Sequence, residues 1–168
     1  MTYVNHSARE IAVGVVLHGP AGAGRRTTRE HLARQLPIVR GRVDNFFDED
    51  PPLRFPTGRE IDGYSVVAYI DLALHARMDV VVVVVDLSPS RREANIAALA
   101  ALRAWPEIPR VLQLNKCDLA ERMSLADAIA LDLGLRGCAT IETSARDGVG
   151  IDDVITTAVD AACARAAL

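Results

Sequence analysis

The stretch that decides the fold is "IAVGVVLHGPAGAGRRTT", residues 11–28. Its first seven residues, 11–17, form a continuous apolar run of the kind that makes a strand buried on both faces. A glycine-rich turn follows, and Thr27 or Thr28 is then placed to cap a helix that Pro37 stops. The stretch therefore predicts a strand, a loop and a helix in that order.

The rest of the chain repeats this alternation. Strands are predicted at residues 64–70, 80–85, 110–114 and from 138, and helices at residues 91–105, 124–133 and 151–166. Asp62-Gly63 is a hairpin turn signal that joins an edge strand at residues 53–61 to the strand after it. The pattern predicts an α/β fold with a doubly wound, mostly parallel six-stranded sheet that has one antiparallel edge strand.

Composition and charge narrow the classes of function. A chain of 168 residues that is 50% hydrophobic and 24% charged suits a single domain over residues 1–168, of which we expect 1–9 to be flexible. The net charge of -3 gives no general attraction to nucleic acid, so no nucleic-acid partner is expected. The longest apolar run is too short to cross a bilayer and the start lacks an apolar signal core, which predicts no transmembrane segment and a cytoplasmic location.

Cysteine and lysine usage are both informative. The three cysteines have no CxxC spacing, which predicts reduced thiols rather than a disulfide framework or a zinc site. Lys116, within "LNKCDL" at residues 114–119, is the only lysine, whereas the other eighteen basic residues are arginine. It directly follows a predicted buried strand. Because the carboxyl ends of parallel strands meet at one edge of such a sheet, we expect a ligand site there.

Three loops at predicted strand ends, residues 19–28, 115–118 and 143–146, together resemble the motifs of the Ras-like small GTPases, and the bacterial gliding-motility members in particular. The resemblance runs from about residue 11 to the C-terminus. It implies a P-loop GTPase-like fold, GTP or GDP as the ligand, a role in signal transduction, and a regulatory or effector protein as a partner. Ordinary turn residues that cap helices are the alternative explanation for these motifs.

The resemblance assigns the guanine site to Asn115, Lys116 and Asp118. It implies that the Asp118 carboxylate accepts both N–H donors of the guanine edge, that Asn115 helps to hold the base and its loop, and that the Lys116 stem covers the ring. Such a carboxylate favours guanine because adenine would leave polar groups unpaired. An arginine fork is wider and planar, so it could not replace the straight lysine stem without moving the loop.

The last loop, "ETSARDG", resembles the family's Ser-Ala-Lys loop. Ser144 and Ala145 match the first two positions, and Arg146 stands in the Lys position. The resemblance implies that the backbone N–H of Ala145 meets the carbonyl oxygen of guanine. This loop and the Asn-Lys-x-Asp element stand about 28 residues apart and in the family's order, a combination that is hard to obtain by chance.

The phosphate loop departs from the family pattern GxxxxGK[ST], in which backbone N–H groups wrap the phosphates, Lys reaches the outer phosphates and the hydroxyl ligates magnesium. The backbone cradle is predicted from three glycines, Gly19, Gly22 and Gly24. However, Arg25 stands in the Lys position and Arg26 in the Ser/Thr position. Thr27 comes one residue late for a magnesium ligand, unless the loop is one residue longer than usual. A flexible basic helix start without a ligand is the alternative interpretation.

The middle of the chain departs further. Asp71 matches the aspartate of the family's Asp-x-x-Gly motif, which reaches magnesium through water, but the Gly position is Leu74. Thr27 and Asp71 are thus the candidate Mg²⁺ ligands. Residues 72–77 are too few for a normal crossover helix, so this region is either reduced to a turn or contains a short helix at 67–77. His75 is interpreted as an exposed loop histidine.

The motifs for hydrolysis are altered, whereas the motifs for the base are intact. Together they predict a guanine-nucleotide-binding, Ras-like regulatory protein with weak or absent intrinsic GTP hydrolysis. One alternative is a protein-interaction module that has lost the nucleotide and uses the surface around Phe46 and Phe47. Another is a GTPase whose partner supplies the missing catalytic group. Thr57 is a candidate for the family's first-switch threonine, although no spacing compels it.

Overall fold

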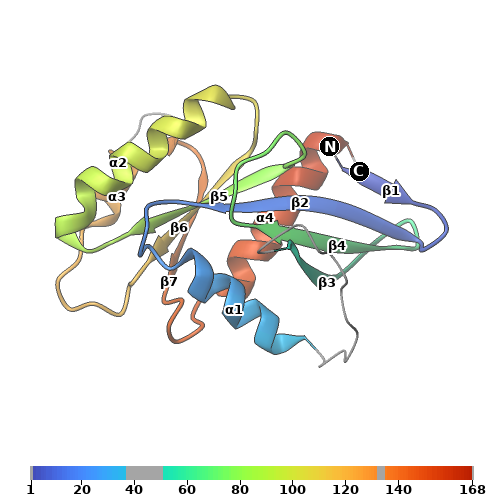
Figure 1. Cartoon of the computed structure of the whole chain (residues 1–168), viewed down its shortest axis with the longest axis horizontal. Helices are drawn as coiled ribbons and strands as arrows, with labels where there is room; N and C mark the ends of the chain where they lie inside the picture. Colours follow the sequence, from blue (N-terminus) through green and yellow to red (C-terminus); the bar gives the residue numbers. More distant parts are fainter. Residues whose placement is uncertain (1, 37–50, 132–134, 168) are drawn as a thin grey trace.

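The computed structural model describes residues 2–36, 51–131 and 135–167. Figure 1 shows one sheet with helices on both sides. Within the described ranges the elements are β1 Tyr3–Asn5, β2 Glu10–His18, α1 Arg25–Gln35, β3 Leu53–Ile61, β4 Tyr64–Asp71, β5 Val80–Asp86, η1 Pro89–Arg91, α2 Arg92–Ala100, η2 Ala101–Ala104, β6 Arg110–Asn115, α3 Leu125–Ile129, β7 Ala139–Thr143 and α4 Ile151–Ala166.

The sheet is mixed and mostly parallel. Its strand order is β3-β4-β2-β5-β6-β7, and β1 pairs with β2 off this path. The predicted α/β class and the antiparallel edge strand β3 are confirmed. The sheet has seven strands rather than six, because β1, which sequence analysis did not predict, adds a second antiparallel pair.

Helices cover both faces of the sheet, as a doubly wound fold requires (Figure 1). Leu32 of α1 and Ile155 of α4 pack on one face, whereas Leu99 of α2 and Ala128 of α3 pack on the other. Every residue of β5, "VVVVVVD", is buried because both of its faces are covered. Because β2, β5, β6 and β7 run parallel to one another, their carboxyl ends meet at one edge of the sheet.

A short segment, residues 72–79, connects β4 to β5 without a helix, and we call it the strap. The predicted helix at residues 67–77 is therefore wrong, and the alternative of a reduced connection is confirmed. The reason is the stagger of the two strands on β2. Asp71 lies level with Val16 of β2, and Val80 lies level with Val15, so the chain crosses β2 with almost no travel along it.

The strap crosses β2 at Gly14. The N–H of Asp79 donates to the Gly14 carbonyl at 2.8 Å, and the Gly14 N–H donates to the Asp79 carboxylate at 2.9 Å. These bonds satisfy the β2 backbone between the positions paired with β1 and with β5. A Cβ atom at residue 14 would lie 2.8 Å from the carbonyl oxygen of Arg77. The crossing therefore requires glycine.

Gly14→Ala is expected to lower the free energy of unfolding by about 1–3 kcal/mol, because the strap backbone has to move. Ala12→Val is the matched control: Ala12 lies on the same strand and lines the same 340 Å³ groove as Gly14, so added methyl groups have room. We expect it to change stability by less than about 0.5 kcal/mol. Urea unfolding of both variants measures the difference, and equal effects would contradict a close crossing at Gly14.

Several predicted helix boundaries need correction. Helix α1 begins at Arg25, after Gly24, so the prediction that Thr27 or Thr28 caps it is wrong. The Thr28 side chain is instead buried and accepts a hydrogen bond from Gln113 Nε2 at 2.9 Å. The predicted helix at 91–105 is divided into the end of η1, then α2 and η2, and α3 is shorter than the predicted helix at 124–133.

Some expectations fall on parts of the chain that the structure does not describe. The predicted helix stop at Pro37, the end of the helix at 124–133, and the surface around Phe46 and Phe47 lie outside the described residues. Among the helices that are described, none combines the length and the apolar character needed to span a membrane.

Candidate nucleotide site

Three predicted loops are held together by one buried side chain, that of Asn115 at the end of β6. Its Nδ2 donates to the carbonyl oxygen of Ala23 at 2.6 Å. Its Oδ1 accepts from the Thr143 hydroxyl at 3.2 Å and from the backbone N–H of Ala145 at 2.8 Å. A single amide therefore joins the glycine-rich loop after β2 to the loop after β7.

The three glycines of the glycine-rich loop are required by its backbone geometry. Gly24 has φ +103°, and a Cβ there would lie 2.1 Å from Asn115 Nδ2. A Cβ at Gly19 would lie 2.2 Å from the carbonyl oxygen of Val84. Gly22 has φ +79°, which side chains rarely adopt. The loop is thus shaped by glycine against β5 and β6, independently of any ligand.

A pocket of about 190 Å³ opens where these loops meet. This volume is smaller than the roughly 300–1,000 Å³ of sites that enclose drug-sized ligands, so it suits one planar ring system rather than a whole nucleotide. Leu119 is the only lining residue that sequence analysis missed. The lining residues are Gly22, Gly24, Thr27, Asn115, Lys116, Asp118, Leu119, Ala145 and Arg146.

The rim of the pocket carries a pair of opposite charges. Arg146 Nη1 lies 3.8 Å from Asp118 Oδ2, and the Arg146 side chain is 78% exposed whereas that of Asp118 is 23% exposed. Ser144 does not line the pocket, because its hydroxyl bonds to Asp147 Oδ2 at 2.8 Å and shapes the turn. Since the Ala145 N–H already donates to Asn115, a guanine carbonyl would have to share that donor.

The Lys116 ammonium is anchored beneath the pocket. Its Nζ donates to Oδ2 of Asp86 at 2.6 Å, and Lys116 itself has φ +70°. Asp86 ends β5 and is fully buried; it also accepts from the N–H and the hydroxyl of Ser88. Burial by itself would raise the pKa of Asp86, but the hydrogen bonds from Lys116 and Ser88 outweigh it and lower the pKa below its ordinary value.

Asp86 was not predicted as a site residue. The sequence pattern that could have identified it is an acidic residue directly after a run of six valines, since such a residue lies at the end of a buried strand, where the site was predicted. The Asn95 side chain of α2 holds the backbone of Asp86 on both sides, donating to its carbonyl at 2.8 Å and accepting from its N–H at 3.1 Å. The carboxylate that positions Lys116 is therefore itself fixed.

The two arginines that replace the family's Lys and Ser/Thr do not line the pocket. Arg25 Nη1 donates to the carbonyl oxygen of Leu72 in the strap at 3.2 Å. Arg26 is exposed on the first turn of α1. Arg25, which stands in the family's Lys position, is thus directed to the strap.

The two candidate magnesium ligands have other surroundings. Thr27 lines the 190 Å³ pocket. Asp71 Oδ1 accepts from the N–H groups of Leu72 and Ala73 at 2.6 and 3.1 Å, and its Oδ2 lies 3.4 Å from His75 Nε2. Across residues 2–36, 51–131 and 135–167, no group of three or more His, Cys, Asp or Glu side chains is placed to hold a metal. A magnesium ion at Asp71 would have to displace these contacts.

Thr57 lies at the opposite edge of the sheet from the pocket. Its hydroxyl donates to the carbonyl of Val66 at 2.8 Å, and Val66 is level with Ile11 near the start of β2. The pocket instead follows His18, at the end of β2. The interpretation of Thr57 as a first-switch threonine is therefore wrong.

His75 is a half-exposed residue of the strap, which agrees with its interpretation as a loop histidine.

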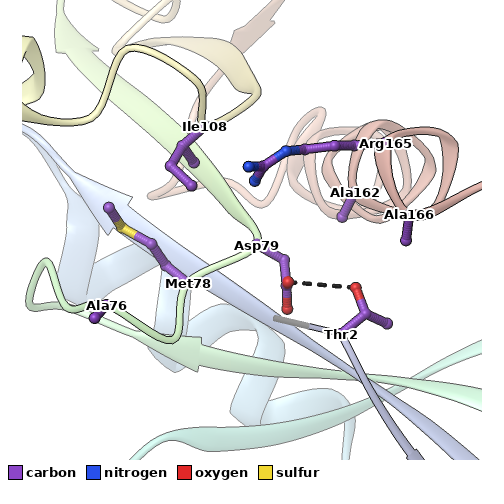
Figure 2. A pocket seen from close by; sticks show the side chains of 8 residues that line it. All are labelled: Thr2, Ala76, Met78, Asp79, Ile108, Ala162, Arg165 and Ala166. Atoms are coloured by element: carbon purple, nitrogen blue, oxygen red, sulfur yellow. Dashed lines mark hydrogen bonds between the residues drawn. The ribbon is translucent and has the colours of Figure 1, made fainter.

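Larger cavities lie away from this site. Figure 2 shows one of about 410 Å³ near the start of β5, between Asp79, Ile108 and Arg165. Its carboxylate, Asp79, accepts hydrogen bonds from Thr2 at 3.3 Å and from Gly14 at 2.9 Å, which gives it a structural role. The smaller pocket is the better candidate site, because it joins three strand ends and collects the groups that would read a base.

Comparison with known proteins does not assign a family. No family model matches the chain, and no curated protein matches it either. The resemblance to the Ras-like GTPases is carried by the motifs alone, and the pocket geometry is the basis for a functional assignment.

Proposed function

We propose that the protein binds a guanine nucleotide at the 190 Å³ pocket and acts as a Ras-like regulatory protein with weak or absent GTP hydrolysis. One observation carries the proposal. Residues far apart in sequence, selected because they match base-binding motifs, line a single pocket with Asp118 at its rim. A carboxylate there would accept the two N–H donors of guanine, while adenine would leave it facing an unsuitable edge.

The surroundings of the phosphate loop support weak hydrolysis. Phosphoryl transfer needs a positioned water and neutralised phosphate oxygens. Arg25 bonds to the strap, and Asp71 bonds to the strap's own N–H groups and lies near His75. The strap is also hydrogen-bonded to β2 at Gly14. We therefore expect this segment to move little when a nucleotide binds.

A second candidate function is a protein-interaction module that binds no nucleotide. It is favoured by the fact that groups a nucleotide would use already have protein partners. Asp118 faces Arg146, the Ala145 N–H donates to Asn115, and Arg25 donates to Leu72. Binding of guanine would have to compete with the first two of these contacts.

Titration of the purified protein with fluorescent GDP, GTP and ADP, each with Mg²⁺ and with EDTA, separates the two functions. We expect GDP and GTP to bind and ADP to bind at least about 100-fold more weakly, because a mismatched polar edge costs several kcal/mol. Magnesium is expected to change GDP affinity only slightly, since Asp71 is engaged elsewhere. Absence of guanine nucleotide binding would favour the interaction module, and multiple turnover of GTP would contradict weak hydrolysis.

A further inference from the structure

A second arginine lies against the glycine-rich loop, outside the motifs that sequence analysis selected. Arg91 ends η1, after β5, and its Nη2 donates to the carbonyl oxygen of Ala21. The same Nη2 atom would lie 4.0 Å from a Cβ atom at Gly22. Neither Ala21 nor Arg91 lines the base pocket. The contact therefore lies on the glycine-rich loop, next to Gly22, which lines the edge of that pocket.

The position of Arg91 is set by the carboxylate that anchors Lys116. Arg91 Nε lies 3.6 Å from Asp86 Oδ2, and Lys116 Nζ lies 2.6 Å from the same oxygen. Because Asp86 is fully buried and its backbone is held by Asn95, both cations are attached to a fixed point. One buried carboxylate thus aligns a cation at the base pocket with a cation at the phosphate loop.

Arg91 retains donors for a ligand. A guanidinium has five N–H donors, and the contacts with Asp86 and Ala21 involve only Nε and Nη2. The side chain is 38% exposed, so part of it is open to solvent. Arg25, which stands in the family's Lys position, is directed to Leu72 instead.

We propose that Arg91 binds the outer phosphates of the nucleotide, in place of the lysine that the phosphate loop lacks. The planar fork suits two phosphate oxygens at once, and charge-assisted hydrogen bonds of this kind are the strong ones. The proposal rests on the proposed function, because the base pocket is what identifies the ligand as a nucleotide. It adds a binding residue to that site and a preference for nucleotides that carry more than one phosphate.

The test compares GMP, GDP and GTP binding by Arg91→Ala, Arg91→Lys and the wild-type protein. Arg91→Ala is expected to weaken GDP and GTP about ten-fold or more and to change GMP less than about two-fold, since only the outer phosphates are contacted. Arg91→Lys, which keeps the charge without the fork, should be intermediate. Arg92→Ala is the matched control, because Arg92 is the adjacent, exposed arginine on α2 and should leave all three affinities unchanged.

Two outcomes would overturn the proposal in a protein that binds guanine nucleotides. Equal losses for GMP and GTP would show that Arg91 only shapes the loop, and unchanged GTP affinity would show that it does not contact phosphate. Thermal unfolding of each variant checks folding, and Arg91→Lys carries the test if the alanine variant does not fold.

A separate titration with inorganic tripolyphosphate tests phosphate binding by Arg91 even if the proposed guanine site is wrong. Inorganic tripolyphosphate needs no base pocket, so it can be titrated even if guanine nucleotides do not bind. We expect the wild-type protein to bind it and Arg91→Ala to bind it about ten-fold more weakly or worse. If tripolyphosphate does not bind, or binds both proteins equally, Arg91 is not a phosphate ligand.

Discussion

Asn115→Ala is expected to lower the free energy of unfolding by about 3–5 kcal/mol, the sum of several buried groups that each cost about 1–3 kcal/mol when left unpaired. The Asn115 side chain bonds to Ala23, Thr143 and Ala145 at once. Its removal separates the glycine-rich loop from the loop after β7. Urea unfolding measures the loss.

Gln113→Met is the matched control for this prediction. Gln113 lies two residues earlier on β6, is an equally buried amide, and its Oε1 has no hydrogen-bond partner among the described residues. Replacing it removes only the bond to Thr28, so we expect a change of no more than about 1 kcal/mol. If Asn115→Ala costs no more than Gln113→Met, Asn115 does not hold the three loops together.

Asp118→Asn is expected to weaken GDP binding at least about 100-fold, because two hydrogen bonds to a charged group, each contributing about 1.5–3 kcal/mol, are lost or reversed. An amide would instead present a donor to the base. Binding of xanthosine diphosphate should rise relative to GDP, since xanthine has an acceptor where guanine has a donor. Titration with both nucleotides measures the change in preference.

The fold should tolerate this substitution, because the ion pair that the Asp118 side chain makes within the described residues is the one with Arg146, at 3.8 Å. Asp147→Asn is the matched control: Asp147 also contacts Arg146, at 3.2 Å, but does not line the pocket. It is expected to leave both affinities unchanged. An unaltered GDP affinity in Asp118→Asn would reject the base-site assignment.

Much of the fold and most of the pocket lining could be predicted from sequence. Continuous apolar runs gave the positions of β2, β5 and β6, because a strand covered on both faces needs no polar side. The convergence of residues 19–24, 115–118 and 144–146 followed from the rule that parallel strands end at one edge of the sheet. Local sequence patterns were therefore sufficient to predict the buried strands and the loops at their carboxyl ends.

The features that could not be predicted depend on distant parts of the chain. Helix α1 begins at Arg25 because Gly24 adopts a left-handed backbone against Asn115, ninety-one positions away. The strap needs no helix because β4 and β5 are staggered on β2, a relation that no single segment encodes. Strand β1 has three residues and gains its stability from pairing with β2.

The contacts of Asp86 are of the same kind. Its carboxylate meets Lys116, which follows β6, and Arg91, which ends η1, and only the assembled sheet brings these groups together. Sequence could mark Asp86 as the end of a buried strand, but the network beneath the pocket depends on the order of β5 and β6.

Backbone amide NMR of the isotope-labelled protein during a GDP titration tests the central claim most directly, because it reports where the ligand binds as well as whether it binds. We predict saturable shifts concentrated at the N–H signals of Lys116, Asp118 and Ala145, which line the pocket, and no such shifts with ADP. Shifts that are absent from these residues, or that ADP reproduces equally, would contradict a guanine pocket at the carboxyl edge of this sheet.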